Sequence, residues 1–87
     1  MERVIEFTPK AHDDLLFFKK TGQIKILKKI RELLESLLKD PYKGIGKPEA
    51  LKYSLSGTWS RRINKEHRLV YEVIELKIFI LSLRGHY

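Results

Sequence analysis

Cysteine is absent from the sequence, which excludes a disulfide framework and a thiolate metal site. Long apolar runs are absent too: no segment approaches the length that spans a membrane, and the opening MERVIEF lacks the apolar core of a signal peptide. We therefore expect a cytoplasmic protein with no membrane association. There are three histidines, and none has a carboxylate partner at helical ligand spacing, so we expect neither a metal nor another cofactor.

Negative charge is also scarce. Eleven Asp and Glu residues face 18 Lys and Arg residues, which leaves a formal charge of +7 on 87 residues. A chain of this length is expected to form one domain spanning residues 1–87. Its positive field attracts polyanions, and nucleic acid or a nucleoprotein is the favoured partner class. A role of the charge in solubility alone stays open as an alternative.

The first half of the chain predicts one strand and two helices. Residues 3–8 are β-branched and aromatic and precede Pro9, which suits a strand at a sheet edge or one paired with the last strand. Thr8 is expected to cap a helix that starts at Pro9 and ends near residue 20, with Asp14 early, where a carboxylate suits the helix dipole. A second helix is predicted over residues 23–39 from the spacing of its apolar residues, which are Ile26, Leu27, Ile30, Leu33, Leu34, Leu37 and Leu38.

The second half predicts a loop followed by strands. Residues 41–56 contain Gly44, Gly46 and Pro48 and are expected to form a loop, with one helical turn over 48–52. Residues 56–73 form two β-prone runs around a polar break at 64–67, and the nearly continuous apolar run 77–83 predicts a central strand. The expected fold is α/β, of the α+β type: two N-terminal helices packed on a twisted, mainly antiparallel sheet.

Three arginines lie in or beside the predicted hairpin, and a cluster of this kind suggests an anionic ligand. Alternation along the strand divides them. Trp59 and Ile63 are expected to face the core, so Arg62, which is out of phase with both, faces the open side of the sheet. Arg68 shares that side only if the turn holds an odd number of residues or a bulge, and we predict the odd turn. Arg61 is in phase with Trp59 and Ile63, so its side chain is expected on their side of the strand, away from Arg62.

Two further residues could carry acid–base chemistry. Glu49 lies among lysines in the glycine-containing loop, where an ordinary surface carboxylate is the simpler explanation. His86 follows the predicted central strand, and it is equally compatible with a frayed end and with a group that transfers protons near neutral pH. From the residues alone, both alternatives stay open.

One long segment carries a family resemblance. The run GKPEALKYSLSGTWSRRINKEHRLVYEV, followed by a closing RGHY, resembles the YoeB/Txe branch of the RelE/ParE toxin superfamily from Gly46 to Tyr87. The DDL and KKI-x-EL elements of the first half fit the same branch, so the resemblance covers essentially the whole chain. It implies a RelE/YoeB-like microbial RNase fold. Ala50, Tyr53 and Gly85 depart from the residues that are common in this branch.

The resemblance implies an enzyme. Members of the branch are ribosome-dependent mRNA interferases, which are metal-independent endoribonucleases that cleave mRNA in the ribosomal A site. Glu49 would be the general base that deprotonates the 2′-hydroxyl, Arg68 would stabilise charge on the scissile phosphate, and His86 would be the general acid for the departing 5′-oxygen. Such chemistry needs an in-line arrangement, a base, an acid and clustered cations.

The resemblance also implies substrate contacts and partners. Lys52 and Arg62 would hold phosphate, and Tyr87 would orient the RNA. The implied partners are an antitoxin of the YefM/Axe type, operator DNA bound through the toxin–antitoxin complex, and a second copy in a possible homodimer. Two alternatives remain: a ParE-like gyrase poison and a non-catalytic ribosome- or RNA-binding module. Glu49 and the closing His-Tyr favour the enzyme, because a gyrase poison needs no acid–base pair.

Overall fold

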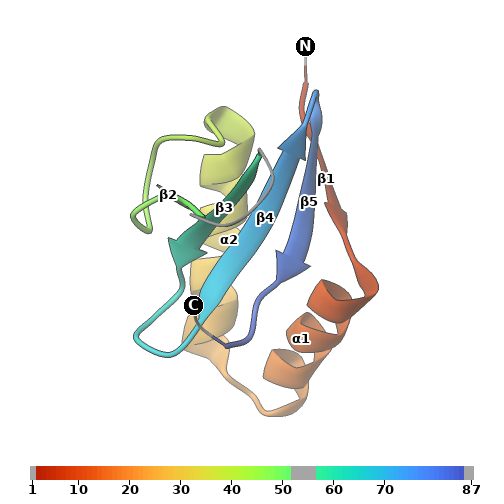
Figure 1. Ribbon diagram of the computed structural model, residues 1–87. Helices are drawn as coiled ribbons and strands as arrows, with labels where there is room; N and C mark the ends of the chain where they lie inside the picture. Colours follow the sequence, from red (N-terminus) through yellow and green to blue (C-terminus); the bar gives the residue numbers. More distant parts are fainter. Residues whose placement is uncertain (1, 52–56, 86–87) are drawn as a thin grey trace.

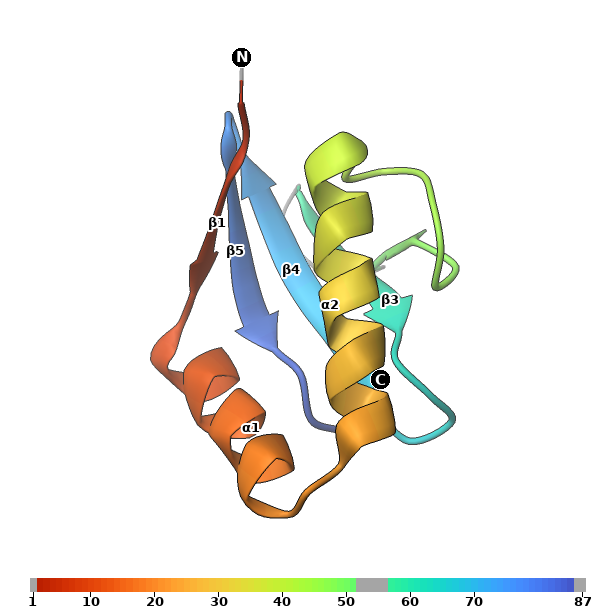
Figure 2. The ribbon, with the colours of Figure 1, turned by 180° about the vertical axis from the view of Figure 1, so that it is seen from behind.

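The sheet forms one layer of the molecule and the two helices form the other. The computed structural model describes residues 2–51 and 57–85. Its sheet has five strands in the order β1-β5-β4-β3-β2, and Figures 1 and 2 show both helices on the same side of it. The elements are β1 Val4–Phe7, α1 Pro9–Lys20, α2 Ile24–Lys39, β2 Glu49–Ala50, β3 Thr58–Arg62, β4 Arg68–Ile74 and β5 Lys77–Ser82. Among these described strands only β1 and β5 pair in parallel, so the predicted mainly antiparallel sheet with two helices is confirmed.

The helices form for the local reasons that the sequence indicates. Thr8 caps α1: its Oγ1 accepts a hydrogen bond from the Ala11 amide at 3.2 Å and donates one to the Ile80 carbonyl of β5 at 3.0 Å. The apolar stripe of α2 turns toward the sheet, although Leu38 at its margin is 44% exposed. Among the described residues, neither helix is long and apolar enough to cross a membrane.

The core lies between the helices and the covered face of the sheet. Phe18 of α1 and Leu33 and Leu37 of α2 are completely buried there against Leu69 of β4 and Ile80 of β5. Burial of a side chain of this size contributes roughly 1.5–3 kcal/mol. This packing fixes β4 and β5 as a rigid support, and the predicted central position of β5 is confirmed by its place between β1 and β4.

The segment before β3 differs from the prediction. The helical turn expected over residues 48–52 is wrong, because Glu49 and Ala50 are extended and pair with Ser60 and Trp59 of β3. The backbone of β3 explains this outcome: its outer edge would otherwise leave amides and carbonyls without partners, and a short strand satisfies them. Glu49 therefore lies on the sheet itself.

Candidate active site

Two arginines face each other across β3 and β4. Arg62 and Arg68 are direct cross-strand partners, and the turn between them, residues 63–67, holds five residues. The predicted odd turn is therefore confirmed. Directly opposite residues share a face of the sheet and have Cβ atoms about 5 Å apart. Two like charges in this position are destabilising by roughly 0.2–1 kcal/mol, a penalty that a bound anion would relieve.

Glu49 shares this face with the two arginines. It lies opposite Ser60, and Ser60 lies opposite Val70, so the three form one row across β2, β3 and β4. The Arg68 Nη1 donates a hydrogen bond to Ser60 Oγ at 3.3 Å, which draws the guanidinium toward the row that contains Glu49. Ser60 and Val70 are buried, while the Glu49 side chain is exposed. A carboxylate and a guanidinium thus flank the same buried hydroxyl.

The loop before Glu49 is fixed against β3. The Arg62 amide donates a hydrogen bond to the Gly46 carbonyl at 2.7 Å. Gly46 has φ 81°, and a Cβ at this position would lie 2.7 Å from Leu33 Cδ2 and 3.1 Å from the Arg62 carbonyl. Only glycine fits both the backbone conformation and the space. Lys47 follows with φ 50°, a left-handed conformation that is uncommon outside glycine.

Grouping Arg61 with Arg62 and Arg68 around one anion is wrong, whereas its predicted place on the core-facing side of the strand is confirmed. Its side chain is completely buried on the helix side of β3. It donates five hydrogen bonds, at distances from 2.7 to 3.3 Å; the acceptors are Ser36 Oγ, Tyr71 Oη and the carbonyls of Asp40, Lys43 and Ile45. All five donors of the guanidinium are therefore used within the protein.

Tyr71 completes this buried network. Its hydroxyl accepts the hydrogen bond from Arg61 Nε and donates one to the Pro41 carbonyl. Burial raises the pKa of the Tyr71 hydroxyl above its ordinary value, although the hydrogen bond and the charge of Arg61 oppose this rise. The phenol therefore stays protonated and able to donate. Together, Arg61 and Tyr71 tie the loop after α2 to the sheet, and this loop leads into Glu49.

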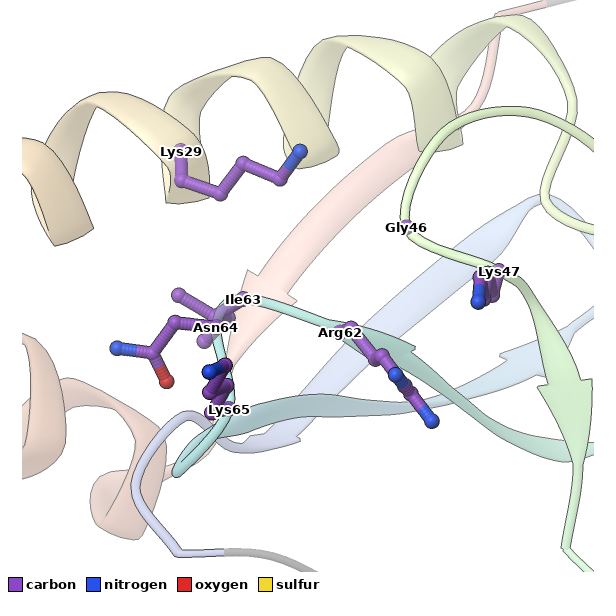
Figure 3. Close-up of a pocket in the computed structure, with 7 residues that line it drawn as sticks. All are labelled: Lys29, Gly46, Lys47, Arg62, Ile63, Asn64 and Lys65. Atoms are coloured by element: carbon purple, nitrogen blue, oxygen red, sulfur yellow. The ribbon is translucent and has the colours of Figure 1, made fainter.

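A basic pocket adjoins Arg62. It has a volume of about 380 Å³ and is open to solvent. Figure 3 shows Lys29 reaching toward it from α2, with Lys47 on the loop side and Arg62 and Lys65 from β3 and the turn after it. The described residues that line it include no carboxylate. Four cations, from α2, the loop, β3 and the turn, give the margin of the sheet between α2 and the end of β3 a local positive potential.

The chain returns to the site at its far end. The Arg68 amide donates a hydrogen bond to the Gly85 carbonyl at 2.9 Å, so the last described residue lies beside the guanidinium-bearing strand. Lys52, His86 and Tyr87, the remaining predicted site residues, lie outside the described residues. The structure therefore brings together Glu49, Arg62 and Arg68. Within the described ranges, no cluster of three His, Asp or Glu side chains is arranged to hold a metal ion.

Comparison with known families decides the family of the chain. A family model described as the YoeB-like toxin of bacterial type II toxin–antitoxin systems matches residues 7–87. The chain belongs to this toxin family. The match includes both helices and all the strands after β1, together with Glu49, Arg62 and Arg68.

Individual relatives agree with this assignment. The chain is 49% identical over 83 residues to the toxin YoeB of Synechocystis sp., which covers 95% of each protein. The YoeB dimer from Staphylococcus aureus matches the structure with a TM-score of 0.89 at 46% identity, over 100% of both chains. The YoeB–YefM complex from the same organism matches with a TM-score of 0.84, again at 46% identity and 100% of both chains.

Sequence reasoning missed three residues that shape this YoeB-like toxin. The Arg61 contacts join segments that are far apart in the chain, so only its core-facing parity gave a signal. Asp14 was assigned to the helix dipole, but its Oδ2 accepts hydrogen bonds from the Leu83 and Arg84 amides at 3.0 and 3.2 Å. His67 accepts one from the Gly85 amide at 3.0 Å. No local sequence pattern indicates the backbone contacts of Asp14 or of His67.

The groups around Asp14 lower the pKa of its carboxyl. Burial raises the pKa of this carboxyl, but the amide of Leu83, the ammonium of Lys10 and the amide of Arg84 together outweigh burial and bring the pKa below its ordinary value. Lys10 Nζ lies 2.8 Å from Asp14 Oδ2, one helical turn away. Asp14 is therefore ionised at neutral pH and acts as an acceptor for the backbone that leads out of β5.

Proposed function

We propose that the chain is a ribosome-dependent mRNA interferase that cleaves mRNA in the A site by attack of a ribose 2′-hydroxyl on the neighbouring phosphate. The observation that carries the proposal is the open face of the sheet, where the exposed Glu49 carboxylate shares a side with the opposed guanidinium groups of Arg62 and Arg68. A base and paired cations on one rigid support are the elements that phosphoryl transfer needs.

Each of these groups has a definite role in the proposed reaction. Glu49 removes the proton from the 2′-hydroxyl, whose oxygen forms a bond to phosphorus while the bond to the 5′-oxygen breaks. Arg68 stabilises the negative charge that develops on the phosphate oxygens, and its guanidinium already points along the sheet toward Ser60, opposite Glu49. Arg62 binds a phosphate. Its side chain is exposed, and a bound anion would relieve the repulsion between Arg62 and Arg68.

The residues outside the described ranges take the remaining roles in the proposal. His86 donates a proton to the departing 5′-oxygen, Lys52 binds phosphate and Tyr87 orients the RNA. The hydrogen bond between Gly85 and Arg68 supports this assignment, because a single peptide bond joins Gly85 to His86. The electron pair of the broken bond between phosphorus and the 5′-oxygen stays with that oxygen, which takes up the proton from His86. The products are therefore a 2′,3′-cyclic phosphate and a 5′-hydroxyl.

The basic pocket supports a nucleic-acid substrate. Lys29, Lys47 and Lys65 extend the positive surface beyond Arg62, and several phosphates of one strand bind more strongly to such a surface than a single phosphate does. Cleavage efficiency should therefore fall steeply as the salt concentration rises.

The partners follow from the relatives. S. aureus YoeB, 46% identical to this chain, forms a complex with YefM and is also known as a dimer. The proposed partners are accordingly an antitoxin of the YefM type and a second copy of the toxin. The antitoxin's acidic segment complements the formal charge of +7. The toxin–antitoxin complex would bind the operator DNA of its own genes.

Primer extension on mRNA in a purified translation system tests the enzymatic proposal. The comparison includes the wild type, Glu49→Gln, Arg68→Ala and the control Arg31→Ala, which removes one exposed positive charge from α2 on the other side of the sheet. We expect cuts at the A-site codon with the wild type and the control, and at least a 100-fold lower rate with the two site variants. Message that stays intact under the wild-type toxin would refute the proposal. A translational block without cuts would favour a binding module, and trapped DNA breaks would favour a gyrase poison.

A further inference from the structure

The segment that leaves β5 is held on one side by α1. The Leu83 and Arg84 amides both donate to Asp14 Oδ2, and the Leu83 side chain is completely buried. The Arg84 guanidinium lies over the ring of Phe17, 3.6 Å from its centroid. A backbone with consecutive amides bound to one carboxylate has little freedom to pivot.

On the other side, Gly85 is bound by the turn between β3 and β4. Its amide donates to His67 Nδ1 at 3.0 Å, and its carbonyl accepts from the Arg68 amide at 2.9 Å. Both polar groups of Gly85 thus contact consecutive residues, and the second is the arginine of the proposed site. Gly85 has φ 99°, a conformation that side chains other than glycine rarely adopt.

His67 is itself held in place. Its amide donates to Asn64 Oδ1 at 2.7 Å, and its carbonyl accepts a hydrogen bond from the Ile63 amide at 3.0 Å. Its ring packs edge-to-face with that of Phe18, with ring centroids 5.1 Å apart, and only 13% of the side chain is exposed. Because Nδ1 accepts a hydrogen bond, this nitrogen carries no proton in the bonded state. The turn therefore offers Gly85 a fixed acceptor.

We infer that His67 is a positioning residue: its Nδ1, together with Asp14, fixes Gly85, the residue that precedes His86 in the chain, relative to Arg68. The inference rests on the proposed function, in which His86 is the general acid. His67 does not take part in the proton transfers. A displaced acid lowers the rate of the chemical step but leaves RNA binding by the lysines and Arg62 unaltered, and a displacement of about 1 Å lowers the rate by roughly 100-fold.

Two substitutions of His67 by an amide residue distinguish the effect of the hydrogen-bond acceptor from the effect of the imidazole ring. In His67→Asn the side-chain oxygen can occupy the position of Nδ1. In His67→Gln the oxygen lies one bond further from the backbone, near the position of Nε2, where it is too distant to accept a hydrogen bond from the Gly85 amide. Both variants lack the ring that packs on Phe18. Their comparison therefore separates the hydrogen-bond acceptor from the ring, and urea titration checks that both are folded and similarly stable.

The experiment measures two quantities for the wild type and both variants: mRNA cleavage kinetics in the purified translation system, and hydrogen exchange of the Gly85 amide by NMR. We expect His67→Asn to keep kcat within about threefold of the wild type. For His67→Gln we expect a kcat lower by roughly 10- to 100-fold, a KM within about twofold, and faster Gly85 exchange.

Equal kcat and equal Gly85 exchange in the two variants would overturn the inference, as would a His67→Gln variant whose loss lies entirely in KM. If the wild type itself cuts no message, the proposed function fails instead. In that case the exchange of Gly85 still decides whether His67 holds this residue, so the two failures are distinguishable.

Discussion

Replacing Arg61 with lysine tests whether the buried guanidinium, and not only its charge, holds the loop after α2. The guanidinium donates five hydrogen bonds, three of them to loop carbonyls. Lysine keeps the charge but has three donors, so at least two bonds are lost. At about 1 kcal/mol for each of two lost bonds, and up to about 3 kcal/mol for each where a buried acceptor is left unsatisfied, the free energy of unfolding should fall by roughly 2–6 kcal/mol.

The matched control is Arg62→Lys, the same chemical change at the neighbouring, exposed residue. We expect a change within about 0.5 kcal/mol for this variant. Urea titration followed by the fluorescence of Trp59 measures both, and thermal unfolding should show a melting temperature lower by about 8–16 °C for a 2 kcal/mol loss in a domain of this size. Equal stabilities of the two variants would refute the reasoning that Arg61 serves the fold while Arg62 serves the open face.

Three further outcomes follow from single contacts. Gly46→Ala should lower the free energy of unfolding by about 1–3 kcal/mol more than Gly22→Ala, because both residues have positive φ but only Gly46 is crowded by its neighbours; urea titration of both decides. The folded pKa of Asp14 lies below the unfolded one, so its contribution to stability is present above pH 4 or so and is lost as the pH falls through the folded pKa. The wild type should therefore lose more stability than Asp14→Asn between about pH 5 and 3, and equal losses would contradict the assignment. Tyr71→Phe should lower the free energy of unfolding by about 1–3 kcal/mol through the Pro41 carbonyl that it leaves without a donor, and an unchanged urea midpoint would argue against that bond.

Local pattern was sufficient for much of the fold. The helical period of α2, the Thr8–Pro9 start of α1 and the apolar run of β5 each depend on neighbours in the chain, and each was predicted close to its observed bounds. The odd number of residues in the turn was also predicted, because Arg62 and Arg68 share a face only across an odd turn or a bulge, and the structure has the odd turn.

The remaining features depend on contacts between distant segments. Glu49 and Ala50 are extended because they pair with the edge of β3, and the local sequence does not indicate this pairing. Asp14 looks like a surface charge in the sequence, and the core-facing position of Arg61 does not reveal its partners, yet each side chain is buried against backbone groups from distant segments. A charged residue at a core-facing position of a strand is the one signal that would have marked Arg61 as structural.

Cleavage of a message that carries a single 2′-deoxyribose at the nucleotide on the 5′ side of the A-site cut tests the central claim most directly. Attack by the 2′-hydroxyl predicts that the purified translation system with wild-type toxin leaves this message intact. The same system should cut the all-ribose message to fragments with a 2′,3′-cyclic phosphate and a 5′-hydroxyl. Cutting of the deoxy message at the same bond, or fragments that carry a 5′-phosphate, would contradict the account.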